Sequence, residues 1–166
     1  MKKKIAILGS TGSIGKSTLA VIRKDKKNFN VVFLSANNNY KKLIHQAKEF
    51  NVENVYIKNE KHFAVVKKSL RKTKTKVFSG KVSISKIISK KVDYTMSAIV
   101  GLAGFQPTID FIKVSRTIAI ANKETIICGW EILSKLIKKY NTKLLPVDSE
   151  HFSIMELTKN VNNDEI

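Results

Sequence analysis

The stretch that decides the fold is Gly9-Ser10-Thr11-Gly12-Ser13-Ile14-Gly15, which lies between an apolar run at residues 5–8 and a stretch with helical spacing. A strand that ends in glycines and continues as a helix is typical of a phosphate-binding turn. Gly9 and Gly12 can take positive φ and, without a Cβ, let the backbone approach a ligand, and we expect Gly15 to let the helix pack close to the strand. The N-terminus of the helix then directs unpaired N–H groups at an anion.

Two phosphate-binding motifs compete for this turn. The dinucleotide motif has the spacing G-x-G-x-x-G, and this chain has the variant G-x-x-G-x-x-G. A nucleoside triphosphate loop, G-x-x-x-x-G-K-[ST], is matched by Gly15-Lys16-Ser17, but Ser10 stands where its first glycine belongs. We favour a dinucleotide, while the triphosphate loop and an ordinary strand-to-helix turn stay open as alternatives.

Length and composition indicate one soluble α/β domain. The 166 residues contain no apolar run of about 20 residues, and the run after Met1–Lys4 is too short and too early for a signal peptide. We therefore expect no membrane association and a cytoplasmic protein. Cys128 is the single cysteine, so it forms no internal disulfide or zinc motif, and we expect it to be a small buried helix residue.

The net charge of +18 raises the question of nucleic-acid binding. The densest basic region, residues 58–91, has Glu60 as its only acid, yet its lysines alternate with apolar residues as on solvated helix faces and strand edges. No aromatic platform or nucleic-acid motif accompanies it. Nonspecific nucleic-acid affinity is therefore kept only as a secondary alternative.

Apolar periodicity predicts alternating strands and helices along the whole chain. This alternation predicts a Rossmann-like, doubly wound, mainly parallel sheet with helices on both faces. His45 and His62 lie on predicted helices without a second ligand at i+4, so neither indicates a metal site. The expected strands are residues 5–8, 30–36, 52–57, 75–78, 92–98, 117–121 and 143–147, and the expected helices are 17–23, 40–50, 61–71, 82–88, 107–114 and 122–137.

Five polar or glycine-rich segments each follow a predicted strand. In a parallel sheet these ends meet at one edge, so we expect the segments to form one crevice. After the second strand stand Asn37, Asn38 and Asn39, followed by lysines, and no acid is present to bind the ribose hydroxyls of NAD. This favours NADP. The segments are residues 9–15, 37–39, 101–104, 122–124 and 148–150.

Asp148 and Glu150 lie two apart, which places both carboxylates on the same side of an extended segment and suits Mg²⁺ or Mn²⁺. A capped helix start, with acids favoured by the helix dipole, explains the same spacing equally well. Lys123 fits either a solvated lysine or a cation that anchors substrate. The stripe of Trp130 with Ile127, Leu133, Leu136 and Ile137 is most simply core packing.

Four segments together resemble the 1-deoxy-D-xylulose 5-phosphate reductoisomerase family: the glycine turn, Ala98-Ile-Val-Gly-Leu-Ala-Gly-Phe-Gln-Pro-Thr108, Ala121-Asn-Lys-Glu124 and Leu145-Pro-Val-Asp-Ser-Glu-His151. The resemblance covers nearly the whole chain. It implies an NADPH- and divalent-metal-dependent enzyme that converts 1-deoxy-D-xylulose 5-phosphate, a phosphorylated sugar, to 2-C-methyl-D-erythritol 4-phosphate in isoprenoid precursor synthesis.

The resemblance also implies roles for individual residues. Cofactor contacts fall on Thr11, Gly12, Ser13, Ile14, Asn39, Asn122 and Glu124. Substrate contacts fall on Lys123, Ser149 and Glu150, metal ligation on Asp148 and Glu150, and the catalytic set is Lys123, Asp148 and Glu150.

Two departures from the family pattern bear on these expectations. Asn37 and Asn38 replace a glycine and a basic residue, which weakens the case for NADP. Members of the family are more than twice as long as this chain, and the resemblance implies a homodimer for the full-length protein. Glu156 and Glu165 do not stand in the motif of the family's further metal ligand, so neither is assigned as a ligand. We therefore expect an NADPH-binding domain at residues 1–150 and the incomplete start of a catalytic domain at 151–166, with a frayed end from Thr158, as in a truncated or split enzyme that is inactive alone.

Overall fold

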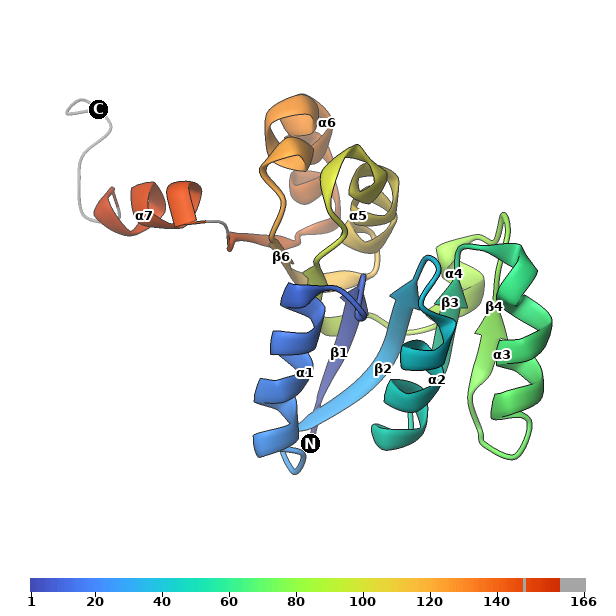
Figure 1. The fold of residues 1–166 in the computed structure, drawn as a ribbon. Helices are drawn as coiled ribbons and strands as arrows, with labels where there is room; N and C mark the ends of the chain where they lie inside the picture. Colours follow the sequence, from blue (N-terminus) through green and yellow to red (C-terminus); the bar gives the residue numbers. More distant parts are fainter. Residues whose placement is uncertain (148, 159–166) are drawn as a thin grey trace.

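The computed structural model describes residues 1–147 and 149–158, which form one seven-stranded sheet with helices on both faces (Figure 1). All strand pairs are parallel. The strands are β1 (Lys3–Leu8), β2 (Phe29–Ala36), β3 (Asn54–Ile57), β4 (Lys76–Phe78), β5 (Val92–Ser97), β6 (Ser115–Ile120) and β7 (Lys143–Pro146). The helices are α1 (Ser13–Lys24), α2 (Tyr40–Glu49), α3 (Phe63–Leu70), α4 (Ile84–Ile87), α5 (Phe105–Ile112), α6 (Lys123–Tyr140) and α7 (Ser149–Leu157), with 3₁₀ turns η1 (Glu60–His62) and η2 (Gly101–Gly104).

The strand order is β4-β3-β2-β1-β5-β6-β7. The chain starts in the middle of the sheet, proceeds to one edge, returns beside β1 and proceeds to the other edge. The order therefore reverses between β1 and β5, which is where doubly wound sheets bind their ligands. This confirms the predicted doubly wound fold.

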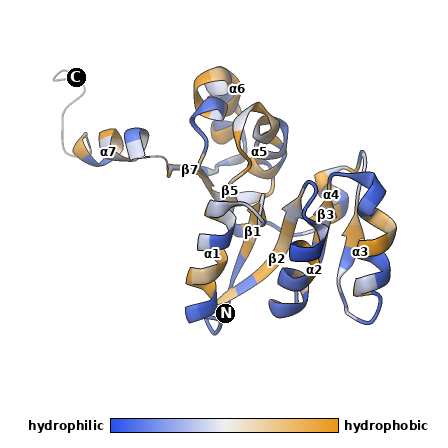
Figure 2. Cartoon of the chain, in the orientation of Figure 1, coloured by the Kyte–Doolittle hydropathy of each residue, from blue (hydrophilic) through white to orange (hydrophobic). Residues whose placement is uncertain are grey.

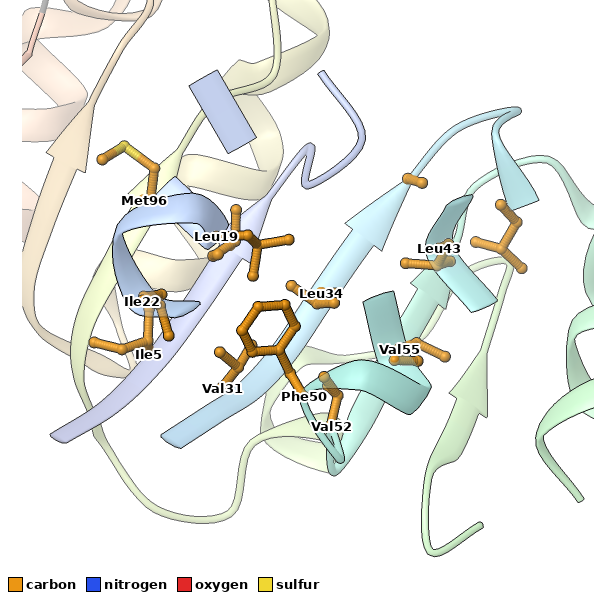
Figure 3. Close-up of a cluster of buried hydrophobic side chains, with 14 of the residues drawn as sticks. Ile5, Leu19, Ile22, Val31, Leu34, Leu43, Phe50, Val52, Val55 and Met96 are labelled. Carbon is orange, nitrogen blue, oxygen red and sulfur yellow. The ribbon is translucent and has the colours of Figure 1, made fainter. Parts of the chain in front are cut away.

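Each face of the sheet has its own hydrophobic core. Alternation along β1 sends Ile5 and Ile7 to one face, and Ala6 and Leu8 to the other. The first core is completed by α1, α2 and α3, and Figure 3 shows Leu19 and Leu43 among its side chains. The second core is completed by α4, α5 and α6. Figure 2 shows the matching hydropathy, with hydrophobic residues along β2 and alternating bands on α1.

Most predicted elements are present, with shifted ends. Helix α1 begins at Ser13, four residues before its predicted start, because Gly12 is its N-cap. Helix α5 ends at Ile112, and α4 is a single turn inside the predicted 82–88 helix. Residues 149–157 form α7, which lies away from the body of the domain (Figure 1). The predicted frayed end falls mainly on residues 159–166, which lie outside the described residues.

The prediction for the buried face of α6 was wrong in part. Trp130 is 54% exposed, and Ile127 and Cys128 are also exposed. Leu133 is buried as predicted, and Leu136 and Ile137 pack against the second core, while Ile126 and Gly129 take the buried positions expected for Ile127 and Trp130. Two overlapping apolar stripes satisfy the same helical period, and the glycine selects one of them: a Cβ at residue 129 would overlap the ring of Phe105. No helix in the described part of the chain has an apolar stretch long enough to cross a membrane.

Candidate functional site

The glycine turn joins β1 to α1 at the point where the strand order reverses. Gly9 has φ +78°, and a Cβ there would lie 2.8 Å from the carbonyl oxygen of Ala98, so the turns after β1 and β5 approach closely. Gly15 packs against Ser10, as predicted, because a Cβ would lie 2.6 Å from its Cα. Gly12, which could also take positive φ, has φ −74° and the extended conformation of an N-cap.

The first turn of α1 is suited to an anion. Gly12 provides no side-chain cap, and the turn carries no acidic residue. The first intrahelical acceptor, the carbonyl of Gly12, bonds the N–H of Lys16. The N–H groups of residues 13–15 come before this first bond and therefore have no intrahelical acceptor. The helix dipole favours negative charge beside them.

Side chains from β2 and α2 fix the shape of the turn. The N–H of Gly9 donates to Ser35 Oγ at 3.0 Å, and the N–H of Ser10 donates to the Ser35 carbonyl at 2.9 Å. Ser10 Oγ donates to Gln46 Oε1 at 2.8 Å, while Gln46 Nε2 donates to the Ser10 carbonyl at 2.9 Å. All four donors therefore have acceptors within the protein, which preorganises the turn.

A cavity of about 750 Å³ opens beside this turn. Gly9, Thr11 and Gly12 line it from the turn after β1, and Ala98 to Val100 line it from the turn after β5. The ends of β2, β3 and β4 contribute further lining residues, namely Asn37, Tyr56, Lys58, Gly80 and Lys81. Lys16, which a triphosphate loop would direct at phosphate, is exposed on α1 and is not among the lining residues.

The end of β2 carries three asparagines, two of which have hydrogen-bonded amide side chains. Asn39 is the N-cap of α2, and its Oδ1 accepts from the N–H of Lys42 at 3.1 Å. Asn59 Nδ2 donates to Asn38 Oδ1 at 2.8 Å. The Asn59–Asn38 bond and the bond from the N–H of Asn59 to the Asn37 carbonyl at 3.3 Å connect the end of β2 to the end of β3.

Asn122 connects the turn after β5 to the start of α6. Its Oδ1 accepts from the N–H of Thr125 at 3.0 Å as the N-cap. Its Nδ2 donates to the carbonyl of Ile99 and, at 3.3 Å, to that of Gly101. Gly104 leaves room for this amide, since a Cβ there would lie 2.6 Å from Nδ2. The buried Asn122 side chain thus holds the polypeptide that lines the cavity.

The starts of α6 and α7 bring two predicted site residues together. Lys123 Nζ lies 3.7 Å from Glu150 Oε1, and both side chains are more than half exposed. Ser149 Oγ donates to Glu150 Oε2 at 2.9 Å. Glu150 lies in the first turn of α7, so the premise of an extended segment was wrong there, and the alternative of a helix start describes the local structure. Asp148 lies outside the described residues.

The family model for 1-deoxy-D-xylulose 5-phosphate reductoisomerase matches residues 5–129, three quarters of the chain, including the glycine turn and Asn122 to Glu124. The chain belongs to the 1-deoxy-D-xylulose 5-phosphate reductoisomerase family. The sequence-based identification is confirmed.

Curated members of the family align with nearly the whole chain. The reductoisomerase of Pelagibacter ubique is 54% identical over 95% of this chain, and that of Phocaeicola vulgatus is 43% identical over 98%. These alignments cover 41% and 43% of the two relatives. The chain therefore spans about two fifths of the length of the curated reductoisomerases it matches.

Solved reductoisomerases share the fold. The enzyme from Zymomonas mobilis in complex with NADPH superposes with a TM-score of 0.84 at 33% identity, covering 91% of this chain and 40% of that one. A reductoisomerase in complex with NADPH, fosmidomycin and magnesium superposes with a TM-score of 0.82 at 33% identity, covering 90% of this chain and 37% of that one. The fold of the described residues is thus that of the reductoisomerase family.

The structure brings part of the predicted reductoisomerase site together. Thr11 and Gly12 line the cavity, while Ser13 and Ile14 form the exposed start of α1. Asn39 and Asn122 cap helices beside it, and Glu124 lies in the first turn of α6. Within the described residues, no group of three or more His, Cys, Asp or Glu side chains is placed to hold a metal.

Sequence reasoning missed the residues that support the turn and the residues that line the cavity after β3 and β4. Gln46 was detectable, since it is a polar residue three positions after the buried Leu43 on an amphipathic helix. Tyr56 lines the cavity and donates to the Gly80 carbonyl at 2.8 Å. Burial raises the pKa of this phenol above its ordinary value, and the Glu60 carboxylate raises it further, so the donor stays protonated.

Proposed function

We propose that the cavity at the end of β1 binds NADPH, with the pyrophosphate at the start of α1. Gly9 and Gly12 supply backbone without side chains, and Thr11, Ser13 and Ile14 surround the helix N-terminus. The uncapped, acid-free first turn fits an anion, and the cavity of about 750 Å³ lies within the usual size range of cofactor sites. The residues present therefore fit the cofactor.

Lys123 and Glu150, which follow β6 and β7, lie on the opposite side of the glycine turn from β2. Lys123 and Ser149 would bind the phosphorylated sugar, and Glu150, with Asp148, would provide hard oxygen ligands for Mg²⁺ or Mn²⁺. NADPH supplies a hydride, and the metal polarises substrate oxygens. In the protein alone, Lys123 and Ser149 hold the Glu150 carboxylate through the ion pair and the hydrogen bond described above.

The activity proposed for the whole protein is the family's NADPH-dependent conversion of 1-deoxy-D-xylulose 5-phosphate to 2-C-methyl-D-erythritol 4-phosphate. The observation that supports it is the ion pair between Lys123 and Glu150, because these two predicted site residues meet at the sheet edge that holds the glycine turn. The proposal includes a cytoplasmic location, a homodimer for the full-length protein, an NADPH-binding domain at residues 1–150 and the start of a catalytic domain at 151–166.

Calorimetric titration with NADPH, NADH and ATP plus Mg²⁺ tests the cofactor proposal. We expect NADPH to bind most tightly. Lys16→Ala is the discriminating variant, since Lys16 lies outside the cavity and its loss is expected to leave NADPH binding nearly unchanged. Preference for ATP, abolished by Lys16→Ala, would establish the triphosphate-loop alternative instead.

An absorbance assay of NADPH oxidation, with 1-deoxy-D-xylulose 5-phosphate and Mn²⁺ or Mg²⁺, tests the reaction. We expect the 166 residues alone to bind the cofactor without turnover, because they span about two fifths of the length of the curated reductoisomerases. Closure around an oriented substrate provides much of the barrier reduction, and we expect it to need the whole enzyme. Turnover that Asp148→Asn abolishes would show that the 166 residues suffice. Turnover that appears only with an added C-terminal polypeptide would show that the expectation is right.

A further inference from the structure

The positions of the predicted site residues indicate how a bound cofactor would be oriented along the sheet edge. Lys123 and Glu150 follow β6 and β7, so the reactive end of a cofactor must lie on that side of the glycine turn. The adenosine end then extends across β2 toward β3 and β4, where the cavity continues. We propose that Lys58 and Lys81, which follow β3 and β4, bind the 2′-phosphate of NADPH and determine the preference for NADPH over NADH. This assignment rests on the proposed function.

Lys58 is held beside the end of β2. It directly follows β3, and its N–H donates to the carbonyl of Ala36, the last residue of β2, at 2.9 Å. Its neighbour Asn59 donates to the carbonyl of Asn37. Lys58 therefore lies one strand away from the position where nicotinamide enzymes choose between their cofactors, and it lines the cavity.

Lys81 is held on the same wall by the segment before it. Ser79 Oγ donates to the carbonyl of Ile57 at 2.6 Å, and the carbonyl of Gly80 accepts from the Tyr56 hydroxyl at 2.8 Å. Gly80 has φ +68°, which redirects the chain toward α4. These bonds attach the turn after β4 to β3, so Lys81 enters the same cavity as Lys58.

The charges on this wall favour an anion. In the described part of the chain, neither lysine ammonium forms an ion pair within 4 Å. Among the described residues, the only acid that lines the cavity is Asp110, which pairs with Lys113 at 3.2 Å. Glu60 lies near Gly80 but is not a lining residue, so the wall formed after β3 and β4 contributes two lysines and no carboxylate to the cavity lining.

Asn37 to Asn39 at the end of β2 provide no positive charge that could bind the 2′-phosphate. All three are neutral: the Asn38 amide accepts from Asn59 Nδ2, and the Asn39 amide caps the start of α2. Lys41 and Lys42 lie in the first turn of α2 and are not cavity-lining residues. A phosphate dianion beside these asparagines would draw its positive charge from Lys58 and Lys81, through charge-assisted hydrogen bonds.

The test compares the affinities of NADPH and NADH in Lys58→Met, Lys81→Met and the double variant. Methionine keeps an unbranched side chain of similar length and removes the positive charge. Lys61→Met is the matched control, because this exposed lysine lies on the same β3–α3 connection and outside the cavity. Lys41→Met and Lys42→Met test the competing lysines. The fragments 2′,5′-ADP and 5′-AMP, which differ only in the 2′-phosphate, isolate its contribution.

Each cavity lysine is expected to contribute about tenfold or more to NADPH affinity and little to NADH affinity, as for the loss of a charge-assisted hydrogen bond. The double variant is expected to lose most of the preference for 2′,5′-ADP over 5′-AMP, and Lys61→Met to keep it. The proposal is also supported if this preference weakens steeply with salt in the wild type and hardly in the double variant.

The outcomes separate this assignment from the proposed function. A preference for NADPH that survives the double variant, or that disappears in Lys41→Met or Lys42→Met, overturns the assignment of Lys58 and Lys81 alone. A protein that binds neither dinucleotide overturns the proposed function and the assignment together. Equal affinity for NADPH and NADH in the wild type overturns the assignment and leaves dinucleotide binding in place.

Discussion

Gln46 and Ser10 are 36 residues apart and exchange two hydrogen bonds, one in each direction, in a buried environment. Ser10 follows Gly9, whose φ of +78° gives the turn after β1 its shape. A side chain on α2 that does not line the cavity thus maintains the polypeptide that does. Gln46 is a positioning residue for the proposed pyrophosphate site.

Gln46→Met is expected to weaken NADPH binding and to lower the free energy of unfolding by about 1–3 kcal/mol. The reason is that Ser10 would be left with a buried hydroxyl and carbonyl without these partners. Urea unfolding measures the stability, and calorimetry at a temperature where the variant is folded measures the affinity. Lys48→Met, on the exposed side of the same helix, is expected to change neither by more than about 0.5 kcal/mol. A loss of stability with unchanged affinity would show that Gln46 supports the fold only.

Two glycines of the turn are expected to respond differently to alanine. At Gly15 a Cβ would lie 2.6 Å and 2.8 Å from backbone atoms of Ser10, which cannot move aside cheaply. Gly15→Ala is therefore expected to lose about 1–3 kcal/mol of stability and most NADPH affinity. At Gly12 the nearest atom would be the Gly9 carbonyl oxygen at 3.4 Å, and φ is −74°. Gly12→Ala is expected to fold with a loss below about 1 kcal/mol. Thermal unfolding of both variants checks this, and equal losses would contradict it.

The fold was predictable because its signals are local and repeated. Strands such as β2 are continuous apolar runs, as buried parallel strands are, and helices such as α2 carry clear amphipathic spacing. The ends and faces of elements depend on tertiary contacts, which no local pattern contains. The buried face of α6 was assigned to Trp130 instead of Gly129, because the ring of Phe105 selects the face from another helix.

The candidate site was predictable where it depends on motifs and on the parallel order of the strands, and unpredictable where it depends on contacts between neighbouring strand ends. The glycine turn and the Lys123 and Glu150 segments could be found from sequence, and the parallel order brings them to one edge. Lys58 and Lys81 look like other lysines in a basic region, and only the hydrogen bonds between strand ends reveal that they share a cavity.

Arg23 and Glu49 join α1 to α2 through hydrogen bonds of 2.5 Å and 3.0 Å, and they give stability a pH dependence. The bond from Arg23 lowers the pKa of the Glu49 carboxyl below its ordinary value, and Lys26 and His45, each 3.9 Å away, act in the same direction. A carboxyl with a depressed pKa in the folded state binds protons less readily there than in the unfolded chain. Its stabilisation is therefore fully present above the unfolded pKa of about 4.3 and is lost as the pH falls through the folded value.

We expect wild type to unfold at a higher temperature than Glu49→Gln at pH 7, and this difference to shrink below about pH 4. Thermal unfolding from pH 7 to pH 3 measures it. Glu131→Gln is the control, because Glu131 forms an exposed ion pair with Lys135 within one helix, which contributes little at any pH. A difference that grows as the pH falls would contradict the assigned direction.

Asn122 permits a test of whether a predicted cofactor residue acts directly or through the protein. Asn122→Asp retains the acceptor that caps α6 but loses the Nδ2 donor to the carbonyls of Ile99 and Gly101. Asn122→Ala loses both functions. We expect the alanine variant to be less stable than wild type by about 2–3 kcal/mol, as the sum of a lost cap and unsatisfied carbonyls, measured by urea unfolding.

Gly104→Ala separates the two roles because its Cβ would displace the Asn122 amide without changing that residue. If Asn122 acts by holding the turn after β5, Gly104→Ala and Asn122→Asp weaken NADPH binding to a similar degree. Their effects in the double variant then fall short of the sum, because both break the same link. If the amide instead contacts the cofactor, Asn122→Asp loses more affinity than Gly104→Ala. The contacts of Asn122 with Ile99, Gly101 and Thr125 use its oxygen and its nitrogen, so we expect the first result, with calorimetry on the three variants as the measurement.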